Sequence, residues 1–228
     1  EAVCFADVLD QLEQGRKPYI VFSHGDYRNA RSIATLLAHR TYLLGMLISL
    51  HGSCATIHDR ITRTKGSFAR TVRSLGVLSA ASIPLATCTV ITSLNVSDTA
   101  SIVEVGLKHG AQDCFFDRLV DIRNSGLKPG AAGLRRAIRN VAAMRVAGMP
   151  VQWGNCVPHC FEKAASGGCL AGLAHAVIGS TGDIRPCVHS SLVVGNILQQ
   201  GMGPIWHSKA LIEWCEDIPS VCRECQSR

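Results

Sequence analysis

The chain has 228 residues, of which 47% are hydrophobic and 18% are charged, and its formal net charge is +6. This composition excludes a disordered chain and predicts a globular protein with a buried core. The longest apolar run, Tyr42 to Leu50, has about half of the roughly 18 residues that a membrane span needs, and the first residues do not resemble a secretion signal. We therefore expect a cytoplasmic protein without membrane contact.

The first two thirds of the chain alternate short apolar runs with amphipathic segments, after an initial helical pattern at residues 5–15. This alternation, with short connections, predicts right-handed βαβ units and a parallel sheet. Functional residues are then expected at the carboxyl ends of the strands. The predicted strands are residues 18–23, 45–50, 83–91 and 113–120, and the predicted helices are residues 28–40, 65–82, 95–110 and 131–148, with Ser67 as a helix cap.

The cysteines divide the chain into two parts, because seven of the eleven follow Pro150. We therefore predict one domain at residues 1–150 and a second at residues 151–228. In a chain without an export signal, dense cysteines indicate metal binding rather than disulfides. Within the second domain, Gly182 and Asp183 predict a hairpin turn that leads to Cys187.

Two segments resemble a known enzyme family. The stretch ISLHGSCATIHDRITRTKGSFART, Ile48 to Thr71, resembles the fourth strand and following loop of radical S-adenosylmethionine enzymes, in which SL[DH]G, HD and GSF recur. The tail resembles the SPASM extension of peptide-modifying members, since Cys169 is followed by 12 residues, Gly182, four residues and Cys187. The resemblance implies an α/β fold: a partial (βα)6 radical SAM barrel (strands three to six), then a cysteine-rich SPASM or twitch-like region with a β-hairpin.

The same resemblance implies two kinds of cofactor, S-adenosylmethionine and auxiliary [4Fe-4S] clusters held by cysteine thiolates. A zinc site remains the alternative, because Cys-x2-Cys also suits tetrahedral zinc. Cys215 lies outside the family pattern, and we expect it to be an ordinary, partly buried thiol. The implied ligands are Cys169 and Cys187, with Cys160 or Cys156 as a third, for the first auxiliary cluster, and Cys222 and Cys225 for the second.

Three residues are implied to lie on the cofactor side of the barrel. Ser49 matches a serine that contacts S-adenosylmethionine, with a plain strand cap as the alternative. Leu119 matches a segment that packs on adenine, and an ordinary core residue is an equally good interpretation. The third residue is Ser23. Ser23 and His24 stand where the family commonly has Thr-Asn, and both are expected to face the substrate.

No residue is assigned a catalytic role. His51, His58 and Asp59 recur in the family pattern, and we favour a role in loop structure over acid-base chemistry for them, because hydrogen-atom abstraction needs no general base.

The sequence lacks the Cys-x3-Cys-x2-Cys and Gly-Gly-Glu motifs of the superfamily. Cys156 and Cys160 have the first spacing, but Lys163 stands where the third cysteine would be. If the fourth-strand match is correct, the first two strand-helix units lie upstream of Glu1, and the tail stops inside its cysteine motif. We therefore expect a fragment that is inactive alone.

The parent enzyme is expected to cleave S-adenosylmethionine to a 5′-deoxyadenosyl radical and to abstract hydrogen from a ribosomally made peptide or protein. The implied partners are that substrate and a reductant protein of flavodoxin or ferredoxin type. The positive charge is spread along the chain, so we expect no nucleic acid partner, although steering of an acidic partner remains open. The alternatives are a non-catalytic peptide-binding module and a zinc-stabilised α/β module.

Overall fold

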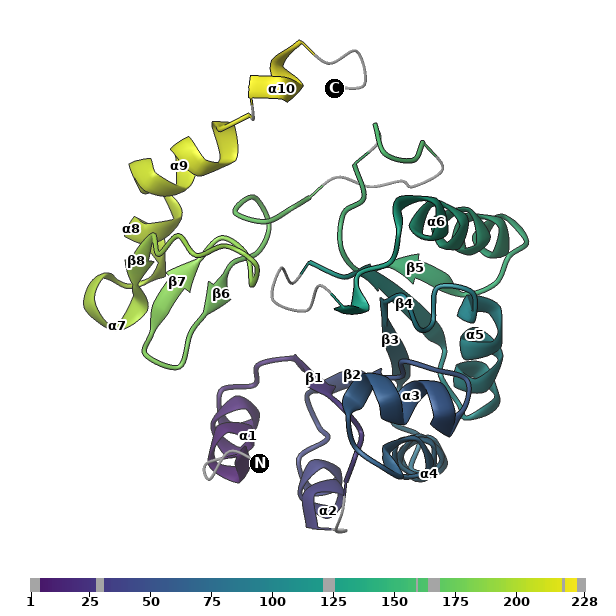
Figure 1. Ribbon diagram of the computed structural model, residues 1–228. Helices are drawn as coiled ribbons and strands as arrows, with labels where there is room; N and C mark the ends of the chain where they lie inside the picture. Colours follow the sequence, from purple (N-terminus) through teal and green to yellow (C-terminus); the bar gives the residue numbers. More distant parts are fainter. Residues whose placement is uncertain are drawn as a thin grey trace. The chain divides into compact units, whose positions relative to one another are not determined.

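The chain forms two compact units, Glu1–Asn155 and Cys156–Arg228 (Figure 1). The computed structural model describes residues 5–27, 31–120, 126–158, 160–163, 169–218 and 220–224. The observed division falls five residues after the position expected from the cysteines, because a short strand, β5, continues the first unit beyond Pro150. No helix in these described ranges is long and apolar enough to cross a membrane.

A five-stranded parallel sheet organises the first unit, as the alternating pattern predicted. Its strands follow one another in chain order across the sheet, and every neighbouring pair is parallel. The strands are β1 (Tyr19–Ser23), β2 (Leu43–Ser49), β3 (Leu85–Ile91), β4 (Asp113–Arg118) and β5 (Val151–Trp153). The helices are α1 (Phe5–Gln14), α2 (Arg31–Ala38), α3 (Ala55–Thr62), α4 (Ser67–Ala80), α5 (Thr99–Lys108) and α6 (Ala131–Val146).

Helices cover one face of this sheet. Burial alternates residue by residue along β3, as expected of a strand with one face in a core. Ile48 of β2 and Phe116 of β4 point into that core and are fully buried. The other face is partly open, and Phe22 of β1 is 74% exposed there.

Two elements differ from the sequence predictions. Ser67 is not the cap of α4: the cap position is Gly66, whose φ of 76° is left-handed. Ser67 is instead the first helical residue, and its buried hydroxyl lies 3.0 Å from the Thr62 hydroxyl. The segment Ala55–Thr62, interpreted as loop, forms the helix α3.

The second unit contains a small antiparallel sheet of the order β6-β7-β8. The predicted hairpin is confirmed between β6 and β7, and Gly182 in its turn has a φ of 85° that favours glycine. Asp183 begins β7, and its carboxylate accepts hydrogen bonds from the Thr181 hydroxyl and the Asn196 amide, which lower the pKa of Asp183. The elements are β6 (Val177–Ile178), β7 (Asp183–Arg185), β8 (Gly195–Asn196), α7 (Ile197–Gln200), α8 (Met202–Trp206), α9 (Lys209–Glu216) and α10 (Ser220–Arg223).

A few apolar side chains hold this second unit together. Ile184, Val194, Ile205 and Leu211 form its core. Cys215, on α9, packs against that core, so its partly buried position agrees with the expectation for an ordinary thiol.

Candidate functional site

A polar cavity of about 350 Å³ lies where β1 and β2 end. It is formed by the loop after β1, the end of β2 with the loop after it, and the connection between α3 and α4. Because parallel strands carry their ligand sites at their carboxyl ends, this position is the one expected for a functional site. The lining residues are His24, Asp26, Ser49, His51, Thr62, Thr64 and Ser67.

Asp59 fixes the α3–α4 side of the cavity. One of its carboxylate oxygens accepts the backbone N–H of Gly66 at 2.6 Å, and the other accepts that of Phe68 at 2.7 Å. These bonds satisfy N–H groups at the start of α4 that have no partner inside the helix. The geometry therefore supports a structural role for Asp59, which holds the connection that contains Thr64.

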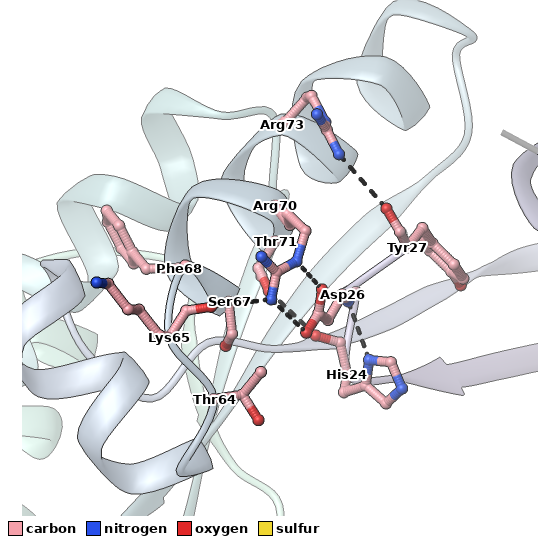
Figure 2. Close-up of polar contacts among 12 residues, drawn as sticks. His24, Asp26, Tyr27, Thr64, Lys65, Ser67, Phe68, Arg70, Thr71 and Arg73 are labelled. Atoms are coloured by element: carbon pink, nitrogen blue, oxygen red, sulfur yellow. Dashed lines mark hydrogen bonds and ion pairs between the residues drawn. The ribbon is translucent and has the colours of Figure 1, made fainter. Parts of the chain in front are cut away.

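The loop after β1 closes the opposite side (Figure 2). Asp26 forms an ion pair with Arg70 of α4, with one N–O distance of 3.0 Å. His24 accepts the backbone N–H of Asp26 through Nδ1 at 2.9 Å, and its carbonyl oxygen accepts the hydroxyl of Thr71 at 3.2 Å. The first unit thus ties this loop to α4 through both side-chain and backbone contacts.

One lining residue, His51, is stacked on a second imidazole, that of His58. The rings of His51 and His58 are 5.9 Å apart and nearly parallel, at 21°. The backbone N–H of His51 donates to Nδ1 of His58 at 3.0 Å. Burial, followed by the neighbouring His58, lowers the pKa of His51 to about 4, and burial also lowers the pKa of His58. Both rings are therefore neutral at pH 7.

Position 52 requires a glycine, because the backbone at Gly52 lies very close to residues of α3. A Cβ atom on Gly52 would lie 2.7 Å from the backbone nitrogen of His58 and from Cβ of Ile57, closer than real contacts allow. Close packing against α3 therefore explains why the last residue of the SLHG motif is a glycine.

The predicted cofactor-side residues occupy different places. Ser49, the last residue of β2, lines the cavity. Ser23 ends β1, and its hydroxyl accepts the backbone N–H of Gly25 at 3.1 Å, but it is not among the lining residues. Leu119 follows β4 and is half-buried, also outside the cavity lining. The roles assigned to these residues by resemblance remain predictions.

Sequence reasoning missed the hydroxyls that the α3–α4 connection brings to the cavity, on Thr62, Thr64 and Ser67. For Ser67 the signal was present in the GSF motif, which was interpreted as a helix start rather than as part of a site.

The predicted cluster ligands are not assembled in the part of the chain that the structure describes, where no group of three or more His, Cys, Asp or Glu is placed to hold a metal ion. No disulfide joins the described cysteines Cys156, Cys160, Cys169, Cys187 and Cys222. The Sγ atom of Cys187 accepts the backbone N–H of His189 at 3.3 Å. Cys225 lies outside the described residues, so the ligand assignment remains a prediction.

A second cavity, of about 430 Å³, lies on the open face of the sheet. Its lining is mostly apolar and includes Phe22 and Phe115. Cys88 and Asp117 also line it, and the Cys88 thiol donates to Oδ2 of Asp117 at 3.3 Å. Burial, reinforced by the Asp117 carboxylate, raises the pKa of Cys88 to about 12.

The contact between Cys88 and Asp117 can be tested through the reactivity of the Cys88 thiol. Because only the thiolate is nucleophilic, Cys88 is expected to stay unmodified by iodoacetamide at pH 8.5, when exposed Cys54 is alkylated. Asp117→Asn removes the negative charge that disfavours the thiolate, so the pKa falls and alkylation of Cys88 at pH 9.5 is expected to become faster. Peptide mass spectrometry over time measures both rates. Equal rates in the two proteins would show that Asp117 does not control this thiol.

Comparisons with known proteins agree with the fold and the cysteine pattern. Residues 169–226 match SPASM, described as an iron-sulfur cluster-binding domain. The structure of SuiB from Streptococcus suis bound to S-adenosylmethionine has a TM-score of 0.74 at 12% identity, covering 97% of this chain and 56% of that chain. The same protein bound to its precursor peptide SuiA also has a TM-score of 0.74.

Curated proteins similar in sequence include two named enzymes. Mycofactocin maturase MftC from Mycolicibacterium smegmatis is 28% identical over 227 residues, which cover 90% of this chain and 56% of that protein. AdoMet-dependent heme synthase from Methanosarcina barkeri is 22% identical over 200 residues, which cover 78% of this chain and 57% of that protein. The chain therefore spans less than three fifths of the length of these relatives.

The parallel sheet followed by the small antiparallel sheet is the fold of SuiB, a protein whose structure has been determined with bound S-adenosylmethionine. This likeness, together with the match of residues 169–226 to the SPASM domain, confirms the resemblance predicted from the sequence. The predicted cofactor classes agree with the iron-sulfur description of that domain and with the S-adenosylmethionine in the SuiB structure.

Proposed function

We propose that this chain provides the S-adenosylmethionine cavity and the auxiliary iron-sulfur ligands of a radical SAM/SPASM enzyme that modifies a ribosomally made peptide or protein. The observation that carries the proposal is the presence of both parts in one chain: a polar cavity containing Ser49 at the strand ends, and a SPASM domain. SuiB, whose fold is similar, has been crystallised with a precursor peptide.

The cavity suits the polar part of S-adenosylmethionine. Four hydroxyls and two imidazoles line it, and these groups can donate to carboxylate oxygens and can both donate to and accept from hydroxyl groups. The only carboxylate among the described lining residues, Asp26, is paired with Arg70, so it adds little uncompensated negative charge. When bound, S-adenosylmethionine would supply the group that abstracts hydrogen from the substrate.

The cysteines of the second unit have the side-chain chemistry that an iron-sulfur cluster requires of its ligands. Thiolates are the usual ligands of such clusters, and hydrogen bonds to the sulfur atoms tune their potentials. Cys187 already accepts one such bond, from the backbone of His189. We propose Cys169 and Cys187, with Cys160 or Cys156, as ligands of one auxiliary cluster, and Cys222 and Cys225 as ligands of another, reduced by a flavodoxin- or ferredoxin-type protein in the cytoplasm.

The sequence of these 228 residues contains no Cys-x3-Cys-x2-Cys motif. We therefore propose that the chain alone binds its cofactors without starting radical chemistry.

Anaerobic reconstitution of the chain with iron and sulfide tests the proposal. We expect iron and acid-labile sulfide in nearly equal amounts, together with the broad visible absorbance of iron-sulfur clusters. Elemental analysis that found bound zinc and no sulfide would instead support the zinc-stabilised module. Isothermal titration with S-adenosylmethionine, at the same protein concentration, tests the cavity, and we expect measurable binding that Ser49→Ala weakens.

A further inference from the structure

His51 is held firmly at the edge of the polar cavity. Its backbone N–H donates to Nδ1 of His58, and its carbonyl oxygen accepts the side-chain amide of Asn95 at 2.9 Å. The His58 ring, which is only 1% exposed, stacks on the His51 ring. These contacts leave His51 little freedom to turn.

The hydrogen bonds also determine which ring nitrogen carries the proton. The backbone N–H of Val90 donates to Nδ1 of His51 at 3.3 Å. A backbone N–H only donates, so Nδ1 is the unprotonated nitrogen, and the proton of the neutral ring is on Nε2. The neutral state follows from burial beside His58. The two carboxylates that act on the adjoining His58 ring, Asp59 and Asp26, are occupied by the start of α4 and by Arg70.

The Nε2–H group has no hydrogen-bond partner among the residues that the structure describes. Polar groups on protein walls are generally satisfied by protein, water or ligand. The ring lines the cavity together with Ser49, so a molecule that fills the cavity is placed to accept this proton. A neutral donor at a fixed position distinguishes an acceptor oxygen from a donor group without adding a charge.

We propose that His51 is a cofactor-binding residue whose Nε2–H donates a hydrogen bond to a hydroxyl or carboxylate oxygen of S-adenosylmethionine in the cavity, and that His58 orients it. This inference rests on the proposed function, since it takes the cavity to be the cofactor site. It assigns to the histidine of the SLHG motif a contact with the ligand, whereas the HD histidine and aspartate support the loop.

Binding of S-adenosylmethionine to the chain, measured by isothermal titration, tests this assignment. His51→Leu removes the donor and is expected to weaken binding about tenfold, the effect of losing one hydrogen bond to a ligand. His51→Gln places an amide N–H at a similar reach and is expected to stay within about threefold of the unaltered chain. His109→Leu, a half-buried histidine at the end of α5, serves as the matched control and is expected to bind normally.

The Ser49→Ala variant separates the two proposals. If Ser49→Ala weakens binding and His51→Leu does not, the role of His51 is wrong and the cavity stands. If neither changes the affinity, or if the unaltered chain does not bind, the cavity is not the cofactor site and both proposals fail.

A second readout needs no affinity measurement. Long-range proton–nitrogen NMR on histidine-labelled protein reports the tautomer of each ring, and we expect the Nε2–H form of His51 throughout pH 6 to 8. The Nε2 resonance is expected to shift when S-adenosylmethionine is added. A ring protonated on Nδ1 would overturn the assignment.

Discussion

Replacing Cys187 with alanine is expected to remove most of the iron that one auxiliary cluster contributes to the reconstituted chain. Iron-sulfur clusters are held by a few converging thiolates, so the loss of one ligand opens the cluster to solvent and to dissociation. Cys187 follows the hairpin strand β7, where the backbone N–H of His189 already donates to its sulfur. Iron and sulfide content per chain, with the visible absorbance, measures the effect.

Cys215→Ser is the control for this experiment. Cys215 is also a partly exposed thiol of the second unit, but it packs on the small core and lies outside the cysteine pattern. A Cβ atom on Gly172 would come within 2.8 Å of its sulfur, which confirms a packed position. The control is therefore expected to keep its iron. Equal iron in Cys187→Ala and in the unaltered chain would contradict the ligand assignment.

Gly25→Ala is expected to lower the free energy of unfolding by about 2 to 4 kcal/mol, from backbone strain and from overpacking together. Gly25 has a φ of 68°, in the left-handed region that favours glycine. Its added Cβ would also lie 2.7 Å from Cγ2 of Ile48, a fully buried residue of β2. Movement away is opposed on both sides, because β2 is paired with β1 and β3 and the loop is held by the ion pair of Asp26 with Arg70.

The control, Gly148→Ala, separates strain from overpacking. Gly148 has a comparable φ of 81°, but a Cβ atom there would meet nothing within 4 Å. We expect Gly148→Ala to lower the free energy of unfolding by about 1 kcal/mol, which is the contribution of backbone strain alone. Urea unfolding followed by circular dichroism measures both variants. Equal losses would mean that the contact with Ile48 relaxes without cost.

The sequence predicted the sheet well because its strands have a strong local signal. Each of β1 to β4 contains a short apolar run of strand length, and the helical segments between these runs require parallel strands. β5 was missed because Val151–Trp153 has only three residues, and its pairing with Cys114 to Phe116 depends on tertiary structure. The helix α3 was missed because its buried residue is a histidine, His58, which interrupts the usual apolar pattern.

The candidate site was predicted in part. Ser49 was found because a strand end and a recognisable motif coincide at that position. Arg70 and Asp26 are 44 residues apart, and no local pattern indicates that they meet. The same holds for Cys88 and Asp117, whose contact follows from the register of β3 with β4. Contacts between distant residues are decided by packing, so a single sequence does not display them.

The last residue of the first unit, Asn155, is bonded through its side-chain amide to the backbone at the end of β4. Its side-chain oxygen accepts the backbone N–H of Arg118 at 3.0 Å, and its side-chain nitrogen donates to the carbonyl oxygen of the same residue at 2.9 Å. One amide group therefore imitates the peptide group of a neighbouring strand. The hydrogen-bonding groups of Arg118 are therefore satisfied by a side chain, and the main chain needs no further strand pairing beyond Asn155.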